Sequence, residues 1–351
     1  MLRIGIIGCG KITQVRHAPE YAENDHCMLA AWYDALPERA QAMADLYGGK
    51  VCASIDELLA MELDAVSVCV ANRAHAEVSI RAMEAGCHVL CEKPMAVTMD
   101  ECEQMLAAAK RTGKVLMIGH NQRFNKAHVE ARRMLKSGEW GKPIGFRTTF
   151  AHPGPEGWTG QQNSWFIQKS QSVFGVLADL GIHKTDIIHY LLDEPIVSVT
   201  AMMGTVDKRY PDGSLIDVED NALCIYRTQS GAMGQMHVSW TNYGSEDNAT
   251  HIYTTKGVLR LYEDPQYSLI FEQPDAEPRR LALDEMTTNE KQTAGQRENT
   301  GVVDAFVQSI QTGQPSVADA EECIKAMRVI FAAVQSAQEG RTIAVQPPEI
   351  I

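Results

Sequence analysis

The stretch GCGKIT, residues 8–13, has the residue types and the spacing of a phosphate-binding turn. It follows an apolar run and opens an amphipathic segment, so it lies between a predicted strand and a predicted helix. Gly8 and Gly10 suit the tight turn and the close approach of a pyrophosphate, whereas Thr13 departs from the G-x-G-x-x-G/A pattern. An ordinary glycine-bearing turn is the alternative. We expect a dinucleotide at this helix N-terminus, contacted by Gly8, Cys9, Gly10, Lys11 and Ile12.

An acid at the end of the second apolar run bears on the form of the dinucleotide. Asp34 stands where a carboxylate can accept hydrogen bonds from an adenosine ribose. A 2'-phosphate would face like charge there, and the next residue, Ala35, has no guanidinium to clamp it. NAD is therefore expected in preference to NADP. An aspartate that opens the turn and caps the next helix is the alternative, and both roles can hold together.

The apolar run at residues 89–91 ends abruptly in Glu92, Lys93 and Pro94. Ligands of an open parallel sheet bind beyond the carboxyl ends of its strands, and this is such an end. A lysine there lies beside a bound cofactor, and Pro94 restricts Lys93 to extended backbone conformations, which helps to fix where the ammonium points. On these three residues alone, a solvated and charged strand terminus is the favoured interpretation.

Strand-like and helix-like segments alternate over the first 120 residues and must position these groups. The predicted strands are Leu2–Ile7, Met28–Tyr33, Ala65–Val70, His88–Cys91 and Val115–Ile118, with a weaker one near Val51. The amphipathic stretches between them are Ile12–Ala22, Pro37–Leu46, Ile55–Ala60, Ala74–Ala85 and Met99–Thr112. Continuous apolar strands separated by helices are typical of a parallel sheet covered on both faces. We therefore expect residues 1–120 to form a doubly wound α/β domain of the Rossmann type.

Strands and helices no longer alternate in the second predicted domain, residues 121–351. After a helix at 127–136, longer strand-like runs follow one another at 144–150, 197–205, 221–228, 232–240, 250–255 and 258–262. Consecutive strands without intervening helices favour an α+β domain with a large open mixed or antiparallel sheet. Helices are expected at 301–311 and 319–338. This domain is expected to bind the substrate and to support oligomerisation.

Composition excludes several classes of function. The chain of 351 residues carries a net charge of −13 and has no basic cluster, so we expect neither nucleic acid nor an anionic membrane surface as a partner. No apolar run is long enough to span a bilayer, and the sequence begins without a signal peptide. The nine cysteines are odd in number and lack the spacing of zinc or redox sites, so we expect no metal and a cytoplasmic location.

Several longer stretches resemble the glucose-fructose oxidoreductase / inositol dehydrogenase (Gfo/Idh/MocA) family. In the first half these are GIIGCG, YDALPERA, ANRAHAEVSIRAMEAGCHVLCEKP and GHNQRF. In the second half they are WFIQKSQSVFGVLADLGIHKTDIIHYLL and SVADAEECIKAMRVIFAAVQSAQEGRTIAV. The resemblance therefore covers nearly the full chain. It implies a nucleotide-binding domain followed by an α/β domain whose open sheet supports dimer or tetramer contacts.

The resemblance also implies roles for individual residues. Lys93 would contact both the substrate and the nicotinamide ribose, commonly with a cis peptide before Pro94. The family's D-x-x-x-H pair falls on Asp179 and His183, which at a helix start share one face and can converge on one substrate hydroxyl. A capping aspartate and a packed core histidine are the alternative. Further cofactor contacts are expected from Asn72, His75, Glu92 and Asn121, and substrate contacts from Arg123, Trp165 and Tyr243.

Aromatic packing is a nearly equal alternative for the last two of these residues. One departure concerns the pocket, because Val173, Phe174 and Gly175 stand where many relatives have a run of glycines. Two side chains then occupy space that glycines would leave open. The substrate of any one relative is therefore a poor guide to the substrate of this chain.

The predicted chemistry is hydride transfer. Oxidising a secondary alcohol requires a base at the hydroxyl while a hydride leaves the same carbon for the nicotinamide. The ordinary pKa of histidine suits proton exchange near neutrality, whereas a lysine ammonium stabilises a developing alkoxide. We therefore expect His183 to be the acid/base, Lys93 its electrostatic and proton-relay partner, and Asp179 the group that orients them.

The sequence thus predicts an NAD-dependent oxidoreductase that acts on a hydroxyl or carbonyl carbon of a sugar, cyclitol or related polyol. A non-catalytic, dinucleotide-binding regulatory protein of the same fold is the alternative. Binding of the cofactor without turnover of any sugar or inositol would favour that alternative.

Overall fold

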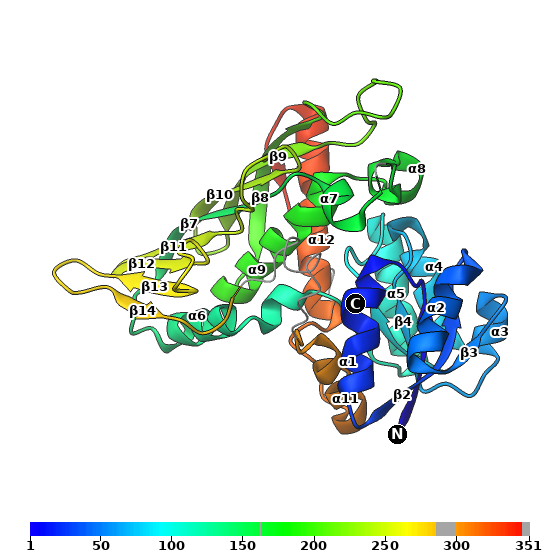
Figure 1. Ribbon diagram of the computed structural model, residues 1–351. Coiled ribbons are helices and arrows are strands. Elements are labelled where there is room, and N and C mark those ends of the chain that lie inside the picture. Colours follow the sequence, from blue (N-terminus) through cyan, green and yellow to red (C-terminus); the bar gives the residue numbers. More distant parts are fainter. Residues whose placement is uncertain (162, 286–298, 346–351) are drawn as a thin grey trace. The chain divides into compact units, whose positions relative to one another are not determined.

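The computed structural model describes residues 1–161, 163–285 and 299–345, which are drawn as ribbons in Figure 1. They form two compact units. The first consists of residues up to Asn121 and the described residues between Lys291 and Ile324; the second contains the described residues of Gln122–Glu290 and of the segment from Lys325 onward. Among the helices of these residues, none combines the length and the apolar character needed to cross a membrane.

The first unit contains a six-stranded parallel sheet with the order β3-β2-β1-β4-β5-β6. Its strands are β1 (Leu2–Ile7), β2 (Cys27–Tyr33), β3 (Lys50–Val51), β4 (Ala65–Val68), β5 (His88–Cys91) and β6 (Leu116–Ile118). The side chains of β4 are buried throughout, which is the pattern of a strand covered on both faces. The predicted doubly wound α/β domain is confirmed.

Helices connect successive strands of this sheet. They are the π-helical η1 (Thr13–His17) with α1 (Ala18–Glu23), α2 (Pro37–Tyr47), α3 (Ile55–Leu59), the short η2 (Asn72–Ala74) with α4 (His75–Glu84), and α5 (Met99–Thr112). A complete capping box begins α5, because the Thr98 hydroxyl accepts from Glu101 N–H while the Glu101 carboxylate accepts from Thr98 N–H. Gly113, in the left-handed region at φ 66°, ends that helix.

The order of the strands reverses between β1 and β4, and this is the switch point at which open α/β sheets bind their ligands. Ile7 pairs with Val68, so the turns that follow these two strands lie side by side. The two turns come closest at Gly8, which has φ 96°. A Cβ atom on Gly8 would lie 2.4 Å from the carbonyl oxygen of Cys69. The first position of the GCGKIT turn therefore accepts only glycine.

A segment near the C-terminal end of the chain packs in the first unit. The N-terminus of α11 (Val302–Thr312) is bound to a buried acid, because Glu20 accepts hydrogen bonds from Thr300 N–H at 2.9 Å and from Val303 N–H at 3.3 Å. The backbone N–H of Ile118 on β6 donates to the carbonyl of Ala318. The sequence-based division at residue 120 assigned this returning segment to the second domain, and these long-range bonds group it with the first unit.

The second unit contains a nine-stranded mixed sheet with the order β14-β13-β12-β11-β7-β10-β9-β8-β15. Strands β7 and β10 are parallel and the other pairs are antiparallel. The strands are β7 (Pro143–Ala151), β8 (Ile196–Gly204), β9 (Asn221–Thr228), β10 (Met233–Ser239), β11 (Thr250–Thr254), β12 (Gly257–Leu261), β13 (Leu269–Glu272), β14 (Arg279–Leu281) and β15 (Ile343–Ala344). The predicted open mixed sheet is confirmed.

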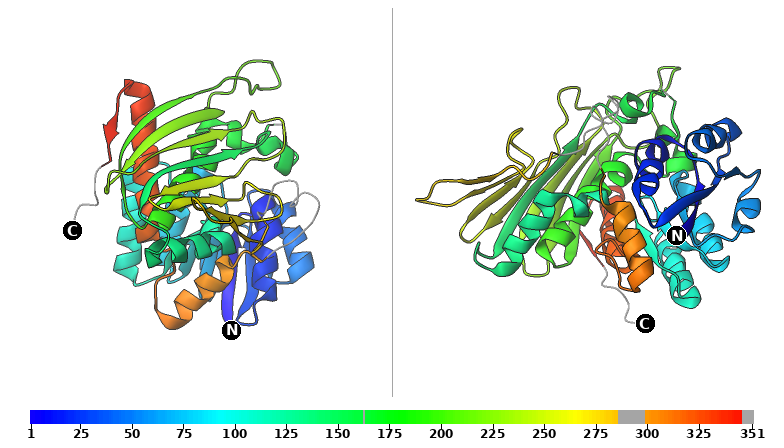
Figure 2. Two further views of the ribbon diagram at one scale, coloured as in Figure 1. Left: turned by 90° about the vertical axis from the view of Figure 1, so that its left-hand side faces the viewer. Right: turned by 60° about the horizontal axis from the view of Figure 1, so that its bottom comes forward.

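Helices cover one face of this sheet and leave the other face open (Figure 2). The helical segments of the unit are η3 (Asn121–Phe124), α6 (Lys126–Ser137), α7 (Pro155–Thr159), η4 (Trp165–Ile167), α8 (Lys169–Ser172), the π-helical η5 (Leu177–Gly181), α9 (Ile182–Leu192) and most of α12 (Ala320–Glu339). Residues of β9 alternate between the two faces: Cys224 and Tyr226 are buried under helices, whereas Leu223 and Ile225 are 51% and 62% exposed.

Candidate functional site

The glycine turn of the first unit is closed by the residue that departs from the expected pattern. The Thr13 hydroxyl donates a hydrogen bond of 2.6 Å to the carbonyl of Gly8, and its side chain is fully buried. Thr13 therefore supplies a bond that fixes the turn, where a third glycine would only allow close packing. A Cβ atom on Gly10 would meet no heavy atom within 4 Å, so this position has the open space that a dinucleotide needs.

Asp34 lies against the same turn. Its carboxylate accepts from the backbone N–H of Cys9 at 2.6 Å and, through its other oxygen, from Leu36 N–H at 2.8 Å. The second bond opens the turn before α2, as the alternative interpretation expected. The first bond holds the carboxylate beside the glycines, where an adenosine ribose would have to bind. Contact with the ribose, and with residues 9–12 of the turn, stays a prediction.

Glu92 and Lys93 follow β5 at the same edge of the sheet. The peptide between Lys93 and Pro94 is cis, as the resemblance to the family implied. Lys93 is half-buried. The Glu92 carboxylate, 6% exposed, accepts from His17 Nε2 at 2.9 Å and lies 3.5 Å from Arg16 Nη1. Burial raises the pKa of Glu92, but these two partners outweigh it and lower that pKa to about 2.

His75 and Asn72 were predicted to contact the cofactor, and both are buried in the first unit. His75 is 1% exposed, with Nδ1 at 2.7 Å from the carbonyl of Pro94 and Nε2 at 3.1 Å from the carbonyl of Val70. Burial lowers the pKa of this imidazole, and a neutral ring can donate only one of these bonds. Asn72 is 5% exposed at the start of η2, and Asn121 follows β6. Their cofactor contacts stay predictions.

Asp179 and His183 belong to the second unit, where η5 passes into α9. The two side chains are 7% and 8% exposed, at the inner face of the sheet. Trp240, after β10, donates its indole N–H to Asp179 Oδ2 at 3.1 Å, and the ring centroid of Phe150 on β7 lies 6.0 Å from that of His183. These two aromatic neighbours exclude water from one side of the pair. A buried carboxylate and a buried imidazole one helical turn apart can exchange and orient a proton.

Another acid, which the sequence analysis missed, anchors the start of this helical segment. Glu219, buried before β9, accepts from Gly175 N–H at 2.8 Å and from Leu177 N–H at 3.1 Å through one carboxylate oxygen. Burial raises its pKa. The backbone N–H of Asp179 in turn donates to the carbonyl of Gly175. Glu219 thus holds the segment that carries Asp179, and its place in the sequence, between Val218 and a second acid, Asp220, gives no signal of this role.

The segment that replaces the glycines of many relatives has a strained backbone. Val173 has φ 69°, a conformation that is rare for a β-branched residue. The Phe174 ring packs edge to face against Phe331 of α12, with 5.9 Å between the ring centroids. Gly175 remains a glycine because a Cβ atom there would lie 2.0 Å from the carbonyl oxygen of Glu219. Packing against α12 therefore accounts for Phe174, and backbone contact for Gly175.

Three residues predicted to contact substrate have partners within the second unit. Arg123 is 3% exposed and donates from Nε and Nη2 to the two oxygens of Asp186, each at 2.7 Å. Trp165 stacks on Phe166 at 4.0 Å, in line with the packing alternative. Tyr243, 62% exposed, donates to Asp207 Oδ2 at 2.5 Å. The Arg123 pair ties η3 to α9 close to His183, and substrate contacts by these three residues stay predictions.

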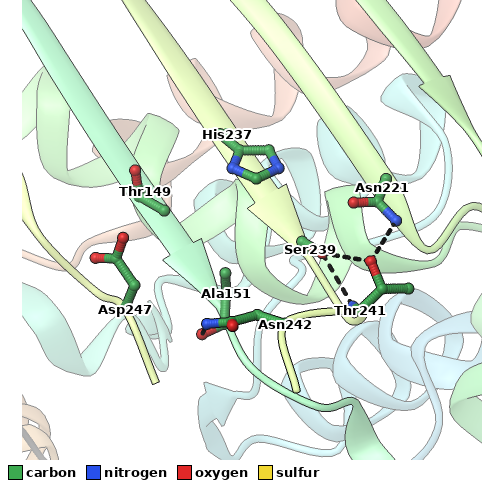
Figure 3. A pocket seen from close by; sticks show the side chains of 8 residues that line it. All are labelled: Thr149, Ala151, Asn221, His237, Ser239, Thr241, Asn242 and Asp247. Carbon is green, nitrogen blue, oxygen red and sulfur yellow. Dashed lines mark hydrogen bonds between the residues drawn. The ribbon is translucent and has the colours of Figure 1, made fainter. Parts of the chain in front are cut away.

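A shallow polar pocket of about 390 Å³ lies on the open face of the large sheet (Figure 3). Hydroxyl groups of Ser239 and Thr241 bind each other at 3.0 Å, and Asn221 donates to Thr241 at 2.9 Å. These polar groups are thus satisfied by one another. The pocket contains none of the residues predicted from the sequence, and it lies on the face opposite to α9. Its lining residues are Thr149, Ala151, Asn221, His237, Ser239, Thr241, Asn242 and Asp247.

Comparison with known proteins covers almost the whole chain. Residues 2–120 match the family model described as an oxidoreductase family with an NAD-binding Rossmann fold, and residues 128–260 match the GFO/IDH/MocA C-terminal domain. D-glucoside 3-dehydrogenase of Escherichia coli K12 is 28% identical, with 97% of each chain covered. Myo-inositol 2-dehydrogenase of Thermotoga maritima is 27% identical, with 98% of this chain and 99% of that protein covered.

Solved structures give the same result for the fold. Levoglucosan dehydrogenase in complex with NADH and levoglucosan superposes with a TM-score of 0.85 over 99% of this chain and 100% of that chain, at 23% identity. The first family match contains the whole parallel sheet, and the second contains strands β7 to β11 of the mixed sheet. This protein belongs to the Gfo/Idh/MocA family of oxidoreductases with an NAD-binding Rossmann domain.

Proposed function

We propose that this oxidoreductase transfers a hydride between NAD and a hydroxyl or carbonyl carbon of a sugar, cyclitol or related polyol. Relatives along the full chain are named for such reactions, at a glucoside and at myo-inositol. The observation that carries the proposal is the pair of buried groups Asp179 and His183 on one helical segment, in a chain whose other unit carries the glycine turn, Asp34 and Lys93. A regulator without turnover would not need that pair.

The residues of the first unit fit a dinucleotide. Gly10 leaves open space, Gly8 allows the turn to pass close to the strand beside it, and Asp34 faces the turn with its carboxylate. Bound NAD supplies the hydride acceptor of the oxidation. The carboxylate of Asp34 would accept from ribose hydroxyls and repel a 2'-phosphate, which favours NAD over NADP.

Proton transfer falls to the residues of this chain. We assign the removal of the hydroxyl proton to the imidazole of His183, because imidazole is the side-chain group most suited to proton exchange near neutrality. The carboxyl group of Asp179 lies one helical turn away and is itself fixed by the Trp240 indole. The Lys93 ammonium stabilises the developing alkoxide by its charge and, as a relay, gives one of its protons to His183 as it takes the hydroxyl proton. In the reverse direction, the same groups protonate the carbonyl oxygen as the hydride arrives.

A screen of sugars, inositols and related polyols for a change in nicotinamide absorbance, run beside an NAD titration, tests the proposal. We expect NAD to bind and at least one polyol to reduce it. Binding of NAD without turnover of any member of a broad set would instead support the regulatory alternative. Failure to bind NAD at all would contradict both.

We further propose that the open face of the large sheet joins copies of this chain into a homodimer or homotetramer. Met202, Leu223, Ile225 and Met233 are apolar and from 51% to 76% exposed on neighbouring strands β8, β9 and β10. An apolar surface of this kind is costly to leave in water. Light scattering should show more than one chain per particle.

A matched pair of variants locates the contact. Ile225→Lys should shift the particle toward the monomer, because it places a charge in the centre of the apolar face. Leu46→Lys changes a side chain that is 70% exposed on α2 and should leave the particle unchanged. A monomeric wild-type protein at micromolar concentration would contradict the proposal.

The nine cysteines all lie among the described residues, where they are buried and form no disulfide, as in proteins of reducing compartments. We therefore also propose a cytoplasmic location, which fractionation of the producing cell would test. Recovery from an oxidising compartment with intact disulfides would contradict it.

A further inference from the structure

Glu92 is the residue before the proposed catalytic lysine, and its carboxylate is almost fully buried. One of its oxygens, Oε1, accepts from His17 Nε2 at 2.9 Å. The other oxygen, Oε2, accepts from the backbone N–H of Lys93 at 3.3 Å. The carboxylate therefore links a histidine of η1 to the main chain of Lys93. Gly119 leaves room for it, since a Cβ atom at that position would lie 3.0 Å from Oε1.

His17 is itself held from its other side. It is fully buried, and its Nδ1 lies 3.2 Å from the hydroxyl of Ser67 on β4. That hydroxyl also bonds the phenol of Tyr21 at 2.9 Å. A line of hydrogen bonds thus runs from Tyr21 through Ser67 and His17 to Glu92. Each of these residues is less than 9% exposed, so the line does not lead a proton to solvent and its role is to fix geometry.

The charges along the line favour a fixed ion pair. Burial opposes the charged form of His17, but the neighbouring Cys69 and Glu92 outweigh it and raise the pKa of His17 to about 10. The lowered pKa of Glu92, about 2, has the same origin. At neutral pH the imidazolium and the carboxylate are therefore both charged. After loss of the imidazolium, the buried carboxylate keeps one cation, Arg16, whose Nη1 lies 3.5 Å from Oε1, and it still needs a donor at the position of Nε2.

We propose that His17 is a positioning residue for the Lys93 ammonium and that it acts through the Glu92 carboxylate. The proposal rests on the catalytic role of Lys93 proposed above. Lys93 stands between two anchored neighbours: Glu92 on one side, and on the other Pro94, whose carbonyl oxygen lies 2.7 Å from His75 Nδ1. Without a donor at the position of Nε2, Oε1 of Glu92 keeps Arg16 Nη1, 3.5 Å away, and the carboxylate turns. Because Oε2 accepts from the backbone N–H of Lys93, this rotation shifts Lys93 and would move its ammonium away from the reacting oxygen.

Two variants of His17 separate this role from simple packing. In His17→Gln the side-chain amide reaches the position of Nε2 and can still donate to Glu92. In His17→Asn the shorter amide reaches only the position of Nδ1, beside Ser67. Both variants are neutral amides in the same cavity, so a purely structural role predicts similar losses. The proposal predicts that Asn lowers kcat about 10-fold more than Gln.

A second readout does not depend on turnover. Trace acetylation with acetic anhydride, followed by peptide mass spectrometry, reports how accessible and how basic Lys93 is, with the exposed Lys142 as an internal standard. We expect His17→Asn to change the relative labelling of Lys93 by about threefold or more, and His17→Gln to stay near wild type. If no polyol is turned over but the labelling follows this pattern, the catalytic proposal fails and the positioning of Lys93 stands.

The matched control is His88→Ala, at the other end of β5. It removes a half-buried imidazole that accepts from Val115 N–H, and should lower stability while leaving Lys93 labelling unchanged. A double-mutant cycle with Glu92→Gln tests the route, because the effect of His17→Asn should shrink to within about twofold in that background.

Three results would overturn the proposal. They are equal labelling of Lys93 in the Asn and Gln variants, a labelling change in the His88 control as large as in His17→Asn, and additive effects in the cycle. If His17→Asn does not fold, as judged by circular dichroism, then His17→Gln alone decides: it must fold and label as wild type does.

Discussion

Gly175→Ala should damage catalysis through the backbone that carries Asp179. The new Cβ atom would lie 2.0 Å from the carbonyl oxygen of Glu219, whereas real contacts of this kind are seldom shorter than 3.0 Å. One of the two segments must therefore move by about 1 Å. Glu219 also accepts from Gly175 N–H and Leu177 N–H, so the movement strains the bonds that begin η5. Overpacking of this kind costs about 1–3 kcal/mol of unfolding free energy.

The catalytic loss is expected to exceed the loss of stability. A displacement of about 1 Å at a proton-transferring group can lower the rate about 100-fold. The assay is kcat on the polyol found by the screen, together with the melting temperature and the NAD affinity, which should stay near wild type. Gly204→Ala is the control, because a Cβ atom there meets no heavy atom within 4 Å. Wild-type kcat in a folded Gly175→Ala protein would refute the reasoning.

Two further predictions concern the cofactor and the pH dependence of stability. Asp34→Ser combined with Ala35→Arg should shift binding from NAD toward NADP in a titration, because it removes the negative charge that faces the 2'-phosphate and adds a guanidinium that can bind it. An unchanged preference for NAD would count against the role of Asp34. Burial lowers the pKa of Lys184 from 10.5 to about 7. Between these two pH values the Lys184 amine carries its proton in the unfolded chain but not in the folded one. The free energy of unfolding should therefore rise with pH by up to about 1.4 kcal/mol per pH unit in this range. Lys184→Met should flatten this rise in denaturant titrations, and an equal slope in both proteins would contradict it.

The sequence predicts best those elements whose pattern is local. Leu2–Ile7 and His88–Cys91 were predicted with the observed bounds, because buried parallel strands are continuous apolar runs. Strand β15, Ile343–Ala344, was missed because it consists of two residues and exists only through its pairing with β8. The predicted helix at Ile12–Ala22 was right in extent but not in form, since its first part is the π-helical η1.

The residues of the candidate site were likewise predictable only where a local pattern or a reactive group marked them. Residue types and the resemblance to a family point to Lys93, Asp179 and His183, because these carry reactive groups. The residues that hold them, such as His17, Glu219 and Trp240, become visible only in the fold. His17 is 75 positions away from its partner Glu92, and Trp240 is 61 positions away from Asp179. No local pattern relates residues so distant, and their pairing depends on the packing of η1 on β5 and of β10 on η5.

The most direct test of the catalytic account is the turnover of His183→Ala. On the polyol found by the screen, kcat should fall by about 10²–10⁴-fold while NAD binds with nearly unchanged affinity, because the imidazole transfers the proton and does not hold the cofactor. His237→Ala, on the open face of the same sheet, should keep kcat near wild type. If folded His183→Ala retains near-normal turnover, then His183 is a packed core histidine and Lys93 must be the base.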